Sequence, residues 1–408
     1  MVTTTDPVSR ALPADGGEWT AREIGQQPAL WREVAAAVTA GRPATEAFLG
    51  PLLARPELRI LLTGAGTSAF AGEILAPGLA RGLRRRVEAV ATTDLVSNPR
   101  ECFAQDLPTL LVSFARSGDS PESVAATRLA DQCLSECHHL VITCNAAGAL
   151  HRAHAGSPRS LVLAMPPASN DRGFAMTSSF TCMVLTALLT LGGPAPDAVT
   201  GVVERLALAA EGVLATRATH ARELADRGHR RIVYLGSGAL TGLARESALK
   251  VMELTAGEVA TWFDSPLGFR HGPKSVLDPG TLVVVYVSTD PYTRAYDLDM
   301  VRELRASGTG AVLVVTAVPL EEPADGTWLV PVEGAAVGDG AVGAAVGDGA
   351  VGAAVGDAEV SLVYVLCAQL LALALSRALG RTPDNPFSAG EVNRVVQGVT
   401  VHPLQAAS

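Results

Sequence analysis

Side chains that could move protons are concentrated between Glu246 and Pro273. Glu246, Lys250 and Glu253 are spaced i, i+4 and i+7, so a helix would place them on one face. His271 follows in the sequence FRHGP, which we expect to be a buried loop. Two carboxylates, an amine and an imidazole within 26 residues are what proton transfer at a sugar carbon requires.

Glu–Lys pairs at this spacing are common on solvated helices, and the spacing alone favours that interpretation. The neighbouring residues favour a function, because Val251, Met252 and Leu254 leave little of the helix free for water. Burying an ionisable group on such an apolar helix is unfavourable unless the group has a purpose.

Two glycine- and hydroxyl-rich turns are candidate anion sites. In the first, Gly64 to Ser68, the amides and hydroxyls of Gly66, Thr67 and Ser68 would gather at a positive helix end. This turn lacks the lysine of a Walker loop and the full dinucleotide fingerprint, so it does not identify its ligand alone.

The second turn follows an apolar strand pattern and contains Arg116, Ser117 and Ser120. Ser120 suits a helix N-cap and Pro121 the first helical position, which is a sufficient structural explanation. A functional role adds to it, since the two hydroxyls and the guanidinium could surround one phosphate. Two such turns on neighbouring parallel strands would form a switch-point pocket.

Short apolar strands alternate with helical stretches, which predicts βαβ units and parallel sheets. Strands are expected at 58–62, 87–91, 109–114, 139–143, 161–164, 232–235, 282–287, 311–315 and 327–331. Helices are expected at 19–40 (ending at Gly41-Arg42-Pro43), 67–80, 121–136, 176–191, 199–227 and 240–256. The similar segments RILLTGAGTSAFAGE and RIVYLGSGALTGLARE indicate a duplicated α/β domain.

Composition narrows the class of protein. A net charge of −9 and 4% aromatic residues argue against a nucleic-acid partner. The N-terminus has no signal pattern, and the longest apolar run, 360–375, is shorter than the ~20 residues of a membrane span. We expect a cytoplasmic protein with no membrane partner, in which this run is a core helix.

The six cysteines form no C-x-x-C pair and are expected to be reduced core residues. The pairs His138-His139 and His151-x-x-His154 could be assembled into a metal site, but no cysteine or carboxylate spacing supports one. We expect no metal and no cofactor. Residues 334–360 are three nine-residue copies, GAAVGDGAV, GAAVGDGAV and GAAVGDAEV, which we interpret as a flexible surface insertion and not a calcium-binding roll.

The motifs GAGTS, ARSGDSPES, ESALKVMELTAGE and RHGP together resemble the sugar isomerase (SIS) family. ITCNAAGAL, NDRGFAMTSSFT and DNPFSAGEVNRVVQGVTVHP resemble its AgaS-type galactosamine-6-phosphate deaminase/isomerases, which are related to the isomerase half of glucosamine-6-phosphate synthase. The resemblance covers residues 45–405 without the repeats. It implies two tandem SIS domains, each a parallel sheet between helices in a three-layer αβα, flavodoxin-like fold.

The resemblance also implies a division of the chain. We expect an N-terminal arm and helix (1–44), a first SIS domain (45–195), a linking helix (196–228), a second SIS domain (229–385) carrying the insertion 334–360, and a C-terminal tail that contributes to the site (386–408).

The resemblance further implies roles for single residues. Glu253 matches the carboxylate that moves a proton between C1 and C2 of the sugar. His271 matches the histidine that opens the sugar ring, on a loop that reaches a neighbouring subunit's site. Lys250 and Glu246 match residues that line the same pocket. The phosphate would be bound by Ser68, Arg116, Ser117 and Ser120, beside Gly66 and Thr67.

The implied reaction converts a 2-amino-2-deoxyhexose 6-phosphate, with galactosamine 6-phosphate favoured, into tagatose 6-phosphate and ammonia. The synthase-type isomerase has a lysine where this chain has Gln397, so a Schiff base there is not available. No glutaminase domain precedes residue 45, which favours release of ammonia over amination. The family resemblance implies a homodimer or larger oligomer with a shared site.

Other functions stay open. The chain could be a dehydratase or an aldose–ketose isomerase acting on glucosamine or N-acetylglucosamine 6-phosphate. It could also be a non-catalytic sugar-phosphate sensor. No helix-turn-helix pattern supports a sensor, and the Glu246, Lys250, Glu253 and His271 set would then have no role.

Overall fold

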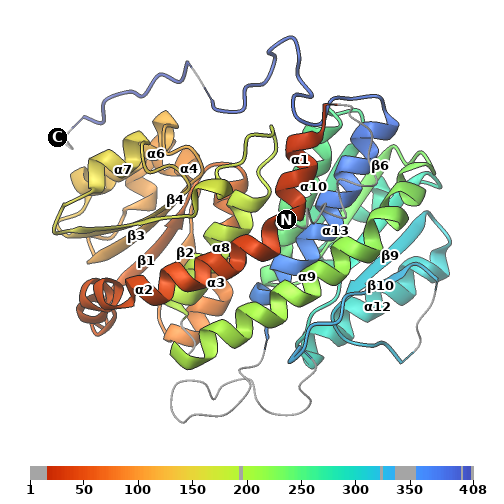
Figure 1. Ribbon diagram of the computed structural model, residues 1–408, viewed down its shortest axis with the longest axis horizontal. Coiled ribbons are helices and arrows are strands. Elements are labelled where there is room, and N and C mark those ends of the chain that lie inside the picture. Colours follow the sequence, from red (N-terminus) through yellow and green to blue (C-terminus); the bar gives the residue numbers. More distant parts are fainter. Residues whose placement is uncertain (1–15, 193–195, 322–324, 336–354, 397, 406–408) are drawn as a thin grey trace, which may run out of the picture.

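The computed structural model describes residues 16–192, 196–321, 325–335, 355–396 and 398–405, and contains two five-stranded parallel sheets (Figure 1). The first sheet has the order β2-β1-β3-β4-β5 and consists of β1 (Arg59–Thr63), β2 (Val87–Ala89), β3 (Thr109–Ala115), β4 (Cys137–Thr143) and β5 (Ser160–Ala164). The second has the order β10-β9-β8-β6-β7 and consists of β6 (Arg231–Leu235), β7 (Ala260–Asp264), β8 (Thr281–Tyr286), β9 (Ala311–Thr316) and β10 (Thr327–Leu329). Read from its β7 edge, the second sheet repeats the order of the first, so the predicted duplication is confirmed.

Burial explains which strands could be predicted. Every residue of β3 and β8 is buried, as expected for strands covered on both faces by helices. The edge strand β7 is mostly exposed and lacks that apolar signal. The sequence prediction has no strand between 240–256 and 282–287 and therefore missed β7.

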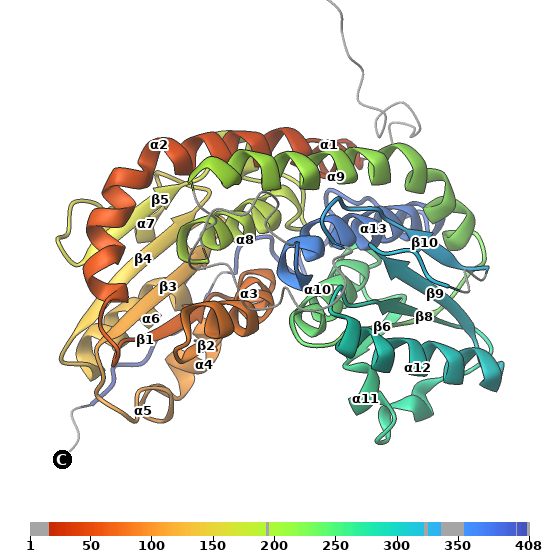
Figure 2. The same ribbon diagram turned by 90° about the horizontal axis from the view of Figure 1, so that it is seen from below.

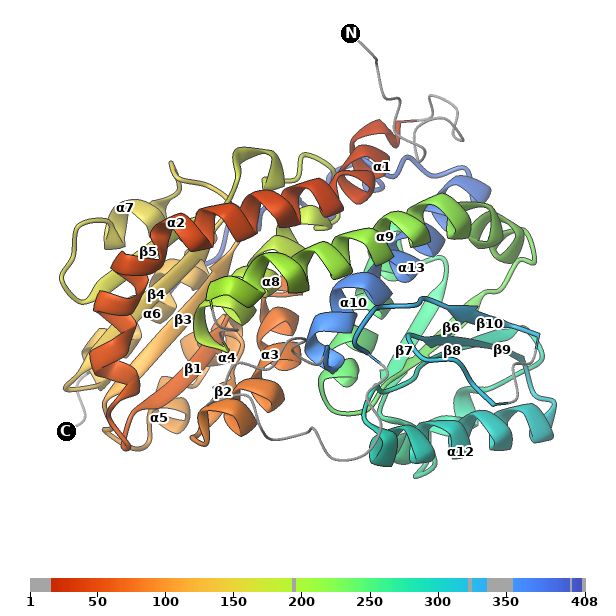
Figure 3. The same cartoon turned by 60° about the horizontal axis from the view of Figure 1, so that its bottom comes forward.

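Helices flank both sheets (Figures 2 and 3). In chain order they are α1 (Glu18–Gly25), α2 (Gln27–Leu53), α3 (Thr67–Leu83), α4 (Thr92–Ser97), α5 (Pro99–Cys102), α6 (Pro121–Cys133), α7 (Ala149–His154), α8 (Ser178–Leu191), α9 (Pro196–Ala225), α10 (Ala239–Leu254), α11 (Pro266–Phe269), α12 (Pro291–Ser307) and α13 (Asp357–Ala378). The long helices α2 and α9 pack side by side; α2 covers the first domain and α9 runs along both domains.

The predicted end of the first helix at Gly41-Arg42-Pro43 is wrong, because α2 continues through Pro43 to Leu53. Proline removes the bond to the carbonyl four residues earlier, which belongs to Thr39. Thr39 is exposed, so water can satisfy that carbonyl and the helix survives.

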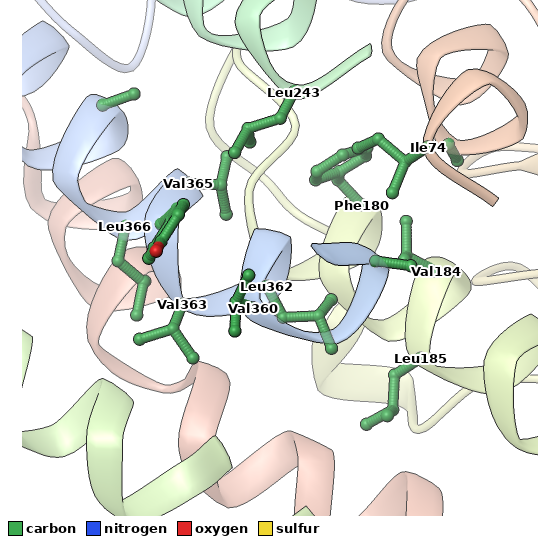
Figure 4. Packing of buried hydrophobic residues seen from close by; sticks show 14 of the residues in the cluster. Ile74, Phe180, Val184, Leu185, Leu243, Val360, Leu362, Val363, Val365 and Leu366 are labelled. Atoms are coloured by element: carbon green, nitrogen blue, oxygen red, sulfur yellow. The ribbon is translucent and has the colours of Figure 1, made fainter. Parts of the chain in front are cut away.

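The predicted core helix is confirmed as α13, in which almost every residue is buried. It is long and apolar enough to cross a membrane, but 94% of its most apolar window is buried inside the protein. Figure 4 shows Val360, Leu362 and Val365 of α13 lying near Phe180 of α8 and Leu243 of α10. One hydrophobic core therefore joins the two domains.

Residues 1–15 of the expected arm, 336–354 of the repeats and Gln397 lie outside the described residues. The first and third copies are in contact, since the Val355 N–H donates to the Gly334 carbonyl at 3.2 Å. The third copy ends inside α13, where Gly356 is the N-cap and Glu359 accepts from its N–H at 3.1 Å. The last part of the expected surface insertion is thus the start of the core helix.

Candidate active site

The candidate site lies where α10 of the second domain packs against α3 of the first (Figure 2). Gly242 permits this contact, because a Cβ there would lie 2.9 Å from the backbone nitrogen of Ile74. One helical turn on, Arg245 pairs with Glu73 at 2.5 Å. The last turns of α10 are thereby brought to the first turn of α3.

Lys250 is the centre of the site and is fully buried. Its Nζ donates to Thr67 Oγ1 at 3.0 Å and to Glu253 Oε2 at 2.5 Å, and lies 3.5 Å from Glu246 Oε1. The predicted shared face of Glu246, Lys250 and Glu253 on one helix is confirmed. The amine of one domain is thus bonded to the glycine turn of the other.

Burial sets the charges of this cluster. It raises the pKa of Glu246 to about 8, which the charge of Glu253 reinforces and that of Lys250 opposes. Neither Glu246 oxygen has a hydrogen-bond partner within the described ranges. Burial lowers the pKa of Lys250, but the two carboxylates outweigh it and the net shift is upward. At neutral pH we therefore infer a cationic Lys250 beside Glu253, with Glu246 as the carboxyl group of the cluster that most readily takes up a proton.

These charges favour distinct chemical roles. A cationic amine cannot act as a nucleophile or base, but it can stabilise negative charge that develops on a substrate oxygen. Glu253 is the acidic member that a ligand can reach, since its side chain is 24% exposed while that of Glu246 is 0%. Met252, which the sequence analysis counted among the residues that shield this helix from water, is 46% exposed, so that expectation is wrong for Met252.

The first glycine turn is confirmed at the N-terminus of α3. Gly66 is the N-cap with φ +56°, a left-handed value that favours glycine. A Cβ on Gly64 would lie 2.6 Å from the backbone of Ser68, so the turn also needs glycine there. Thr67 and Ser68 are both buried. The Thr67 hydroxyl accepts from Lys250, so it positions the amine as well as bordering the turn.

The second predicted turn lies at the same edge of the sheet, because Thr63 of β1 pairs with Ser113 of β3 just before the two turns begin. Ser120 is the N-cap of α6, yet its side chain makes no capping bond. Among the residues that the structure describes, Ser117 Oγ accepts only a long bond, 3.3 Å, from the Asp119 N–H. Both hydroxyls are therefore available to a ligand at this helix end.

Arg116 is buried and is held by backbone carbonyls, which the sequence did not predict. Its Nη1 donates to Phe174 at 3.3 Å and its Nη2 to Arg394 of the C-terminal tail at 2.6 Å. Burial lowers its pKa, and its charge acts on both Glu253 and Lys250. The tail is thereby brought to the site.

Sequence reasoning missed two supports of the serine turn. Asn145 donates to the Ser117 carbonyl at 2.8 Å. Asp171 is fully buried and accepts from Ser179 Oγ at 2.5 Å, which fixes the two ends of the segment that contains Phe174, whose carbonyl accepts from Arg116. The motifs ITCNAAGAL and NDRGFAMTSSFT contain these residues and were the available signal. Their roles depend on contacts between distant segments, which a local pattern does not give.

His271 is not brought to the cluster. The expectation of a buried FRHGP loop is wrong, because Arg270, His271 and Gly272 are exposed. Within the described part of the chain, no hydrogen bond or ion pair links His271 to Glu246, Lys250 or Glu253. The loop follows α11, which Figure 2 shows at the lower edge of the second domain, below α10.

The second domain has the same turns, but its own carboxylates occupy them. The Ser237 hydroxyl donates to Asp297 at 2.5 Å, and the Ser288 N–H donates to the same carboxylate at 2.9 Å. Asp357, at the start of α13, accepts from Ser288 Oγ at 2.6 Å and from the Thr289 N–H at 2.7 Å. These groups are not free for an external anion.

The sequence pattern that defines the SIS domain matches the chain twice, over residues 52–191 and 226–332. The chain belongs to the SIS domain family. A Streptomyces coelicolor protein provisionally named D-galactosamine-6-phosphate deaminase AgaS is 60% identical over 98% of this chain and 99% of its own. An Escherichia coli protein named D-galactosamine-6-phosphate deaminase AgaS is 45% identical over 96% of this SIS protein and 97% of its own.

A solved structure is similar along the whole fold. The structure of tagatose-6-phosphate ketose/aldose isomerase from Escherichia coli has a TM-score of 0.83 and 43% sequence identity. The alignment covers 97% of this chain and 100% of that chain.

Proposed function

We propose that this protein is an amino-sugar phosphate deaminase/isomerase that converts galactosamine 6-phosphate into tagatose 6-phosphate and ammonia. The contact of Lys250 with both Thr67 and Glu253 supports this most directly, because it joins an acid–base cluster to an anion-binding turn. Relatives with 60% and 45% identity carry the corresponding name. We further propose that it is a cytoplasmic enzyme whose deamination consumes water.

The site residues have distinct roles in this proposal. Ser68, Ser117 and Ser120 bind the phosphate, and the charge of Arg116 favours it. Glu253 removes the C2 proton of the open-chain aldehyde to give an enolamine, and returns a proton to C1 to give a ketimine. Water then hydrolyses the ketimine to the ketose and ammonia. Lys250 stabilises the negative charge on O1 in the enolisation step.

His271 would open the sugar ring in the site of a neighbouring subunit. Its exposed position away from Glu253 supports this arrangement. Exposed apolar side chains lie on β7 and α11, which precede its loop in the chain, namely Trp262 at 48%, Phe263 at 37% and Leu267 at 43%. An apolar patch on an edge strand is typical of a surface that another chain covers.

Ammonia release tests the proposed reaction. Purified protein is incubated with galactosamine 6-phosphate, glucosamine 6-phosphate and N-acetylglucosamine 6-phosphate, and ammonia and ketose are measured. We expect both products from galactosamine 6-phosphate, in equal amounts. A melting temperature raised by the sugars without any turnover would instead indicate a sensor, and an ultraviolet-absorbing product from the acetylated sugar a dehydratase.

A ketose/aldose isomerase is the second candidate, because the similar Escherichia coli structure bears that name. Tagatose 6-phosphate distinguishes the two, since an isomerase would convert it into an aldose 6-phosphate without ammonia. The deaminase proposal predicts no such conversion.

Mixed oligomers test the shared site. Glu253→Gln and His271→Asn chains are each expected to be inactive alone. After the two are unfolded and refolded together, a mixed dimer contains one site with both native residues. Random pairing then restores about a quarter of the wild-type activity. Absence of any recovery, with mixed dimers verified by mass spectrometry, would place His271 in the site of its own chain.

A further inference from the structure

A pocket that shares no residue with the candidate active site lies between α1 and the segment that follows β5. Trp19, Arg22 and Gln26 line it from one side, because their spacing of three and four residues places them on one face of α1 and its C-cap. Arg172 and its neighbours in the segment 167–172 line the other side. The pocket encloses about 110 Å³, which is smaller than the ~300–1,000 Å³ of pockets for whole small molecules and suits a compact group.

Two guanidinium groups converge on the indole ring of Trp19 in this pocket. Arg172 Cζ lies 3.8 Å from the ring centroid and Arg22 Cζ lies 5.7 Å from it. Among the residues that the structure describes, no carboxylate forms an ion pair with either arginine. Contact with a ring face uses none of the N–H donors of a guanidinium. Both arginines are exposed, so these donors are open to a ligand.

The carboxyl groups near the pocket have other partners. Glu23 is buried and accepts from the backbone N–H groups of residues 172 and 173. Asp171 and Asp384 accept from backbone N–H groups at the first turns of α8 and α1, whose positive ends compensate their charge. Burial, reinforced by Asp171, raises the pKa of Glu23 to about 8, so this carboxyl group carries less negative charge near neutral pH than an exposed one would. The two guanidinium groups are therefore the charges of the pocket that are left for a ligand.

We propose that this pocket binds a phosphate group through Arg22 and Arg172, at a site distinct from that of the substrate phosphate. Arginine suits phosphate because its planar set of N–H donors can bond two oxygens at once. Two guanidinium groups also match the double negative charge of phosphate, and the bound anion relieves the repulsion between them. The size of the pocket favours the phosphate group itself over a whole sugar phosphate.

The segment that carries Arg172 continues to the candidate active site. The carbonyl of Phe174, two residues on, accepts from Arg116 at 3.3 Å, and the carbonyl of Asp171 accepts from Arg394 of the C-terminal tail. The two sites are thus neighbours along the chain, although they have no residue in common. Binding at the pocket does not depend on the proposed reaction and is tested without turnover.

The fluorescence of Trp19 reports on the pocket directly. The full-length protein is titrated with inorganic phosphate and, in a second series, with methyl phosphate, while sodium chloride keeps the ionic strength constant. We expect a saturable change of tryptophan emission that is absent in Trp19→Phe. Saturation by both probes would assign the site to the phosphate group of a larger monoester, and saturation by inorganic phosphate alone to the free ion. A response that does not saturate with either probe, or one that persists in Trp19→Phe, would overturn the proposal.

Charge-removing variants assign the response to the two arginines. Arg22→Gln and Arg172→Gln should each raise the dissociation constant for inorganic phosphate by about tenfold or more, because each removes hydrogen bonds to a charged group. The matched control is Arg227→Gln, which removes an exposed guanidinium that does not line the pocket and should leave the dissociation constant unchanged.

A second control separates this pocket from the substrate site. Ser120→Ala, in the turn proposed to bind the substrate phosphate, should leave the Trp19 response unchanged, whether or not the proposed reaction is correct. Wild-type affinity in both Arg22→Gln and Arg172→Gln would contradict the assignment. So would a response that Ser120→Ala abolishes, because the phosphate would then be bound at the substrate site.

Discussion

The two domains have the same frame but different contents at their turns. Gly66 and Gly238 adopt almost the same conformation, with φ +56° in both and ψ −128° and −121°. In the first domain, the turn after β3 contains Ser120, whose hydroxyl makes no capping hydrogen bond to α6. In the second, Ser288 is bonded to the carboxylates of Asp297 and Asp357.

This difference shows how a duplicated fold comes to have one site. A helix N-terminus with hydroxyls attracts an anion in either domain. The second domain supplies that anion from its own side chains, and the bonds tie α12 and α13 to its sheet. The first leaves its turns open, and α10 of the second domain brings Lys250 and Glu253 to them. We therefore propose that the chemistry takes place at the domain junction.

The largest expected effect tests the contribution of the second domain. Glu253→Gln should lower kcat by ~10²–10⁴-fold, because it removes a positioned base. The variant should keep its fold, since this side chain is partly exposed. The matched control is Glu258→Gln, which removes only a surface ion pair with Arg381. Activity near the wild-type level in Glu253→Gln would show that Glu253 is not the base.

Paired serine substitutions test the contrast between the turns directly. Ser120→Ala should raise KM by about 10–100-fold, because a hydrogen bond to a charged group is worth ~1.5–3 kcal/mol. Ser288→Ala should leave KM unchanged and lower the melting temperature, because it breaks a bond to Asp357. A rise of KM in the Ser288 variant would mean that the second turn also binds substrate.

The junction between the domains depends on the approach of α10 to α3. Gly242→Ala should destabilise the protein by about 1–3 kcal/mol and lower kcat/KM, because the new methyl group meets backbone. Gly78→Ala, in α3 with nothing nearby, should be neutral or stabilising by up to about 1 kcal/mol. Denaturant unfolding compares the two variants. Equal stabilities would indicate that the helix contact is not tight.

Two buried acidic residues of the second domain, Glu246 in the candidate site and Asp297 at the closed turn, should titrate in different pH windows. Burial raises the pKa of Glu246 from 4.5 to about 8, so the folded state binds the proton more tightly and stability falls as pH rises between these values. Glu246→Gln should therefore flatten the loss of melting temperature between pH 5 and 8. Burial raises the pKa of Asp297 from 3.8 to about 6, so its contribution to stability should fall between these pH values and stay constant above about pH 6. Asp297→Asn should therefore change the pH dependence of the melting temperature only below about pH 6. An unchanged pH profile in Glu246→Gln would contradict the inferred protonation.

The smallest effect is expected from the repeats. Deleting residues 334–351 removes two copies and joins Glu333 to Gly352, so Gly352 takes the place of Gly334 in the chain. The carbonyl that accepts from Val355 would then belong to the residue three positions earlier, which is the spacing of a β-turn. Activity should hardly change and the melting temperature should not fall, because a loop shortened about tenfold costs only about 2 kcal/mol less to close. A large loss of activity, or of bound calcium, would show that the removed copies have a function.

The sequence predicted the features that local pattern controls. Strand–turn–helix units, the shared face of Lys250 and Glu253, and the N-cap at Ser120 all follow from spacing within one segment. The exposure of His271 was not predictable, because it depends on which strand forms the sheet edge. The closure of the second turn by Asp357 and the convergence of Arg22 and Arg172 on one pocket depend on how separate elements pack.

The most direct test of the account is a crystal structure with galactosaminitol 6-phosphate, an open-chain analogue that cannot react. We predict one molecule per chain, with its phosphate on Ser68, Ser117 and Ser120 and its C1–C2 bond beside Glu253. The turn at Ser288 should hold no analogue. A phosphate at Ser288, or a C1–C2 bond distant from Glu253, would contradict the central claim that one domain binds the anion and the other supplies the base.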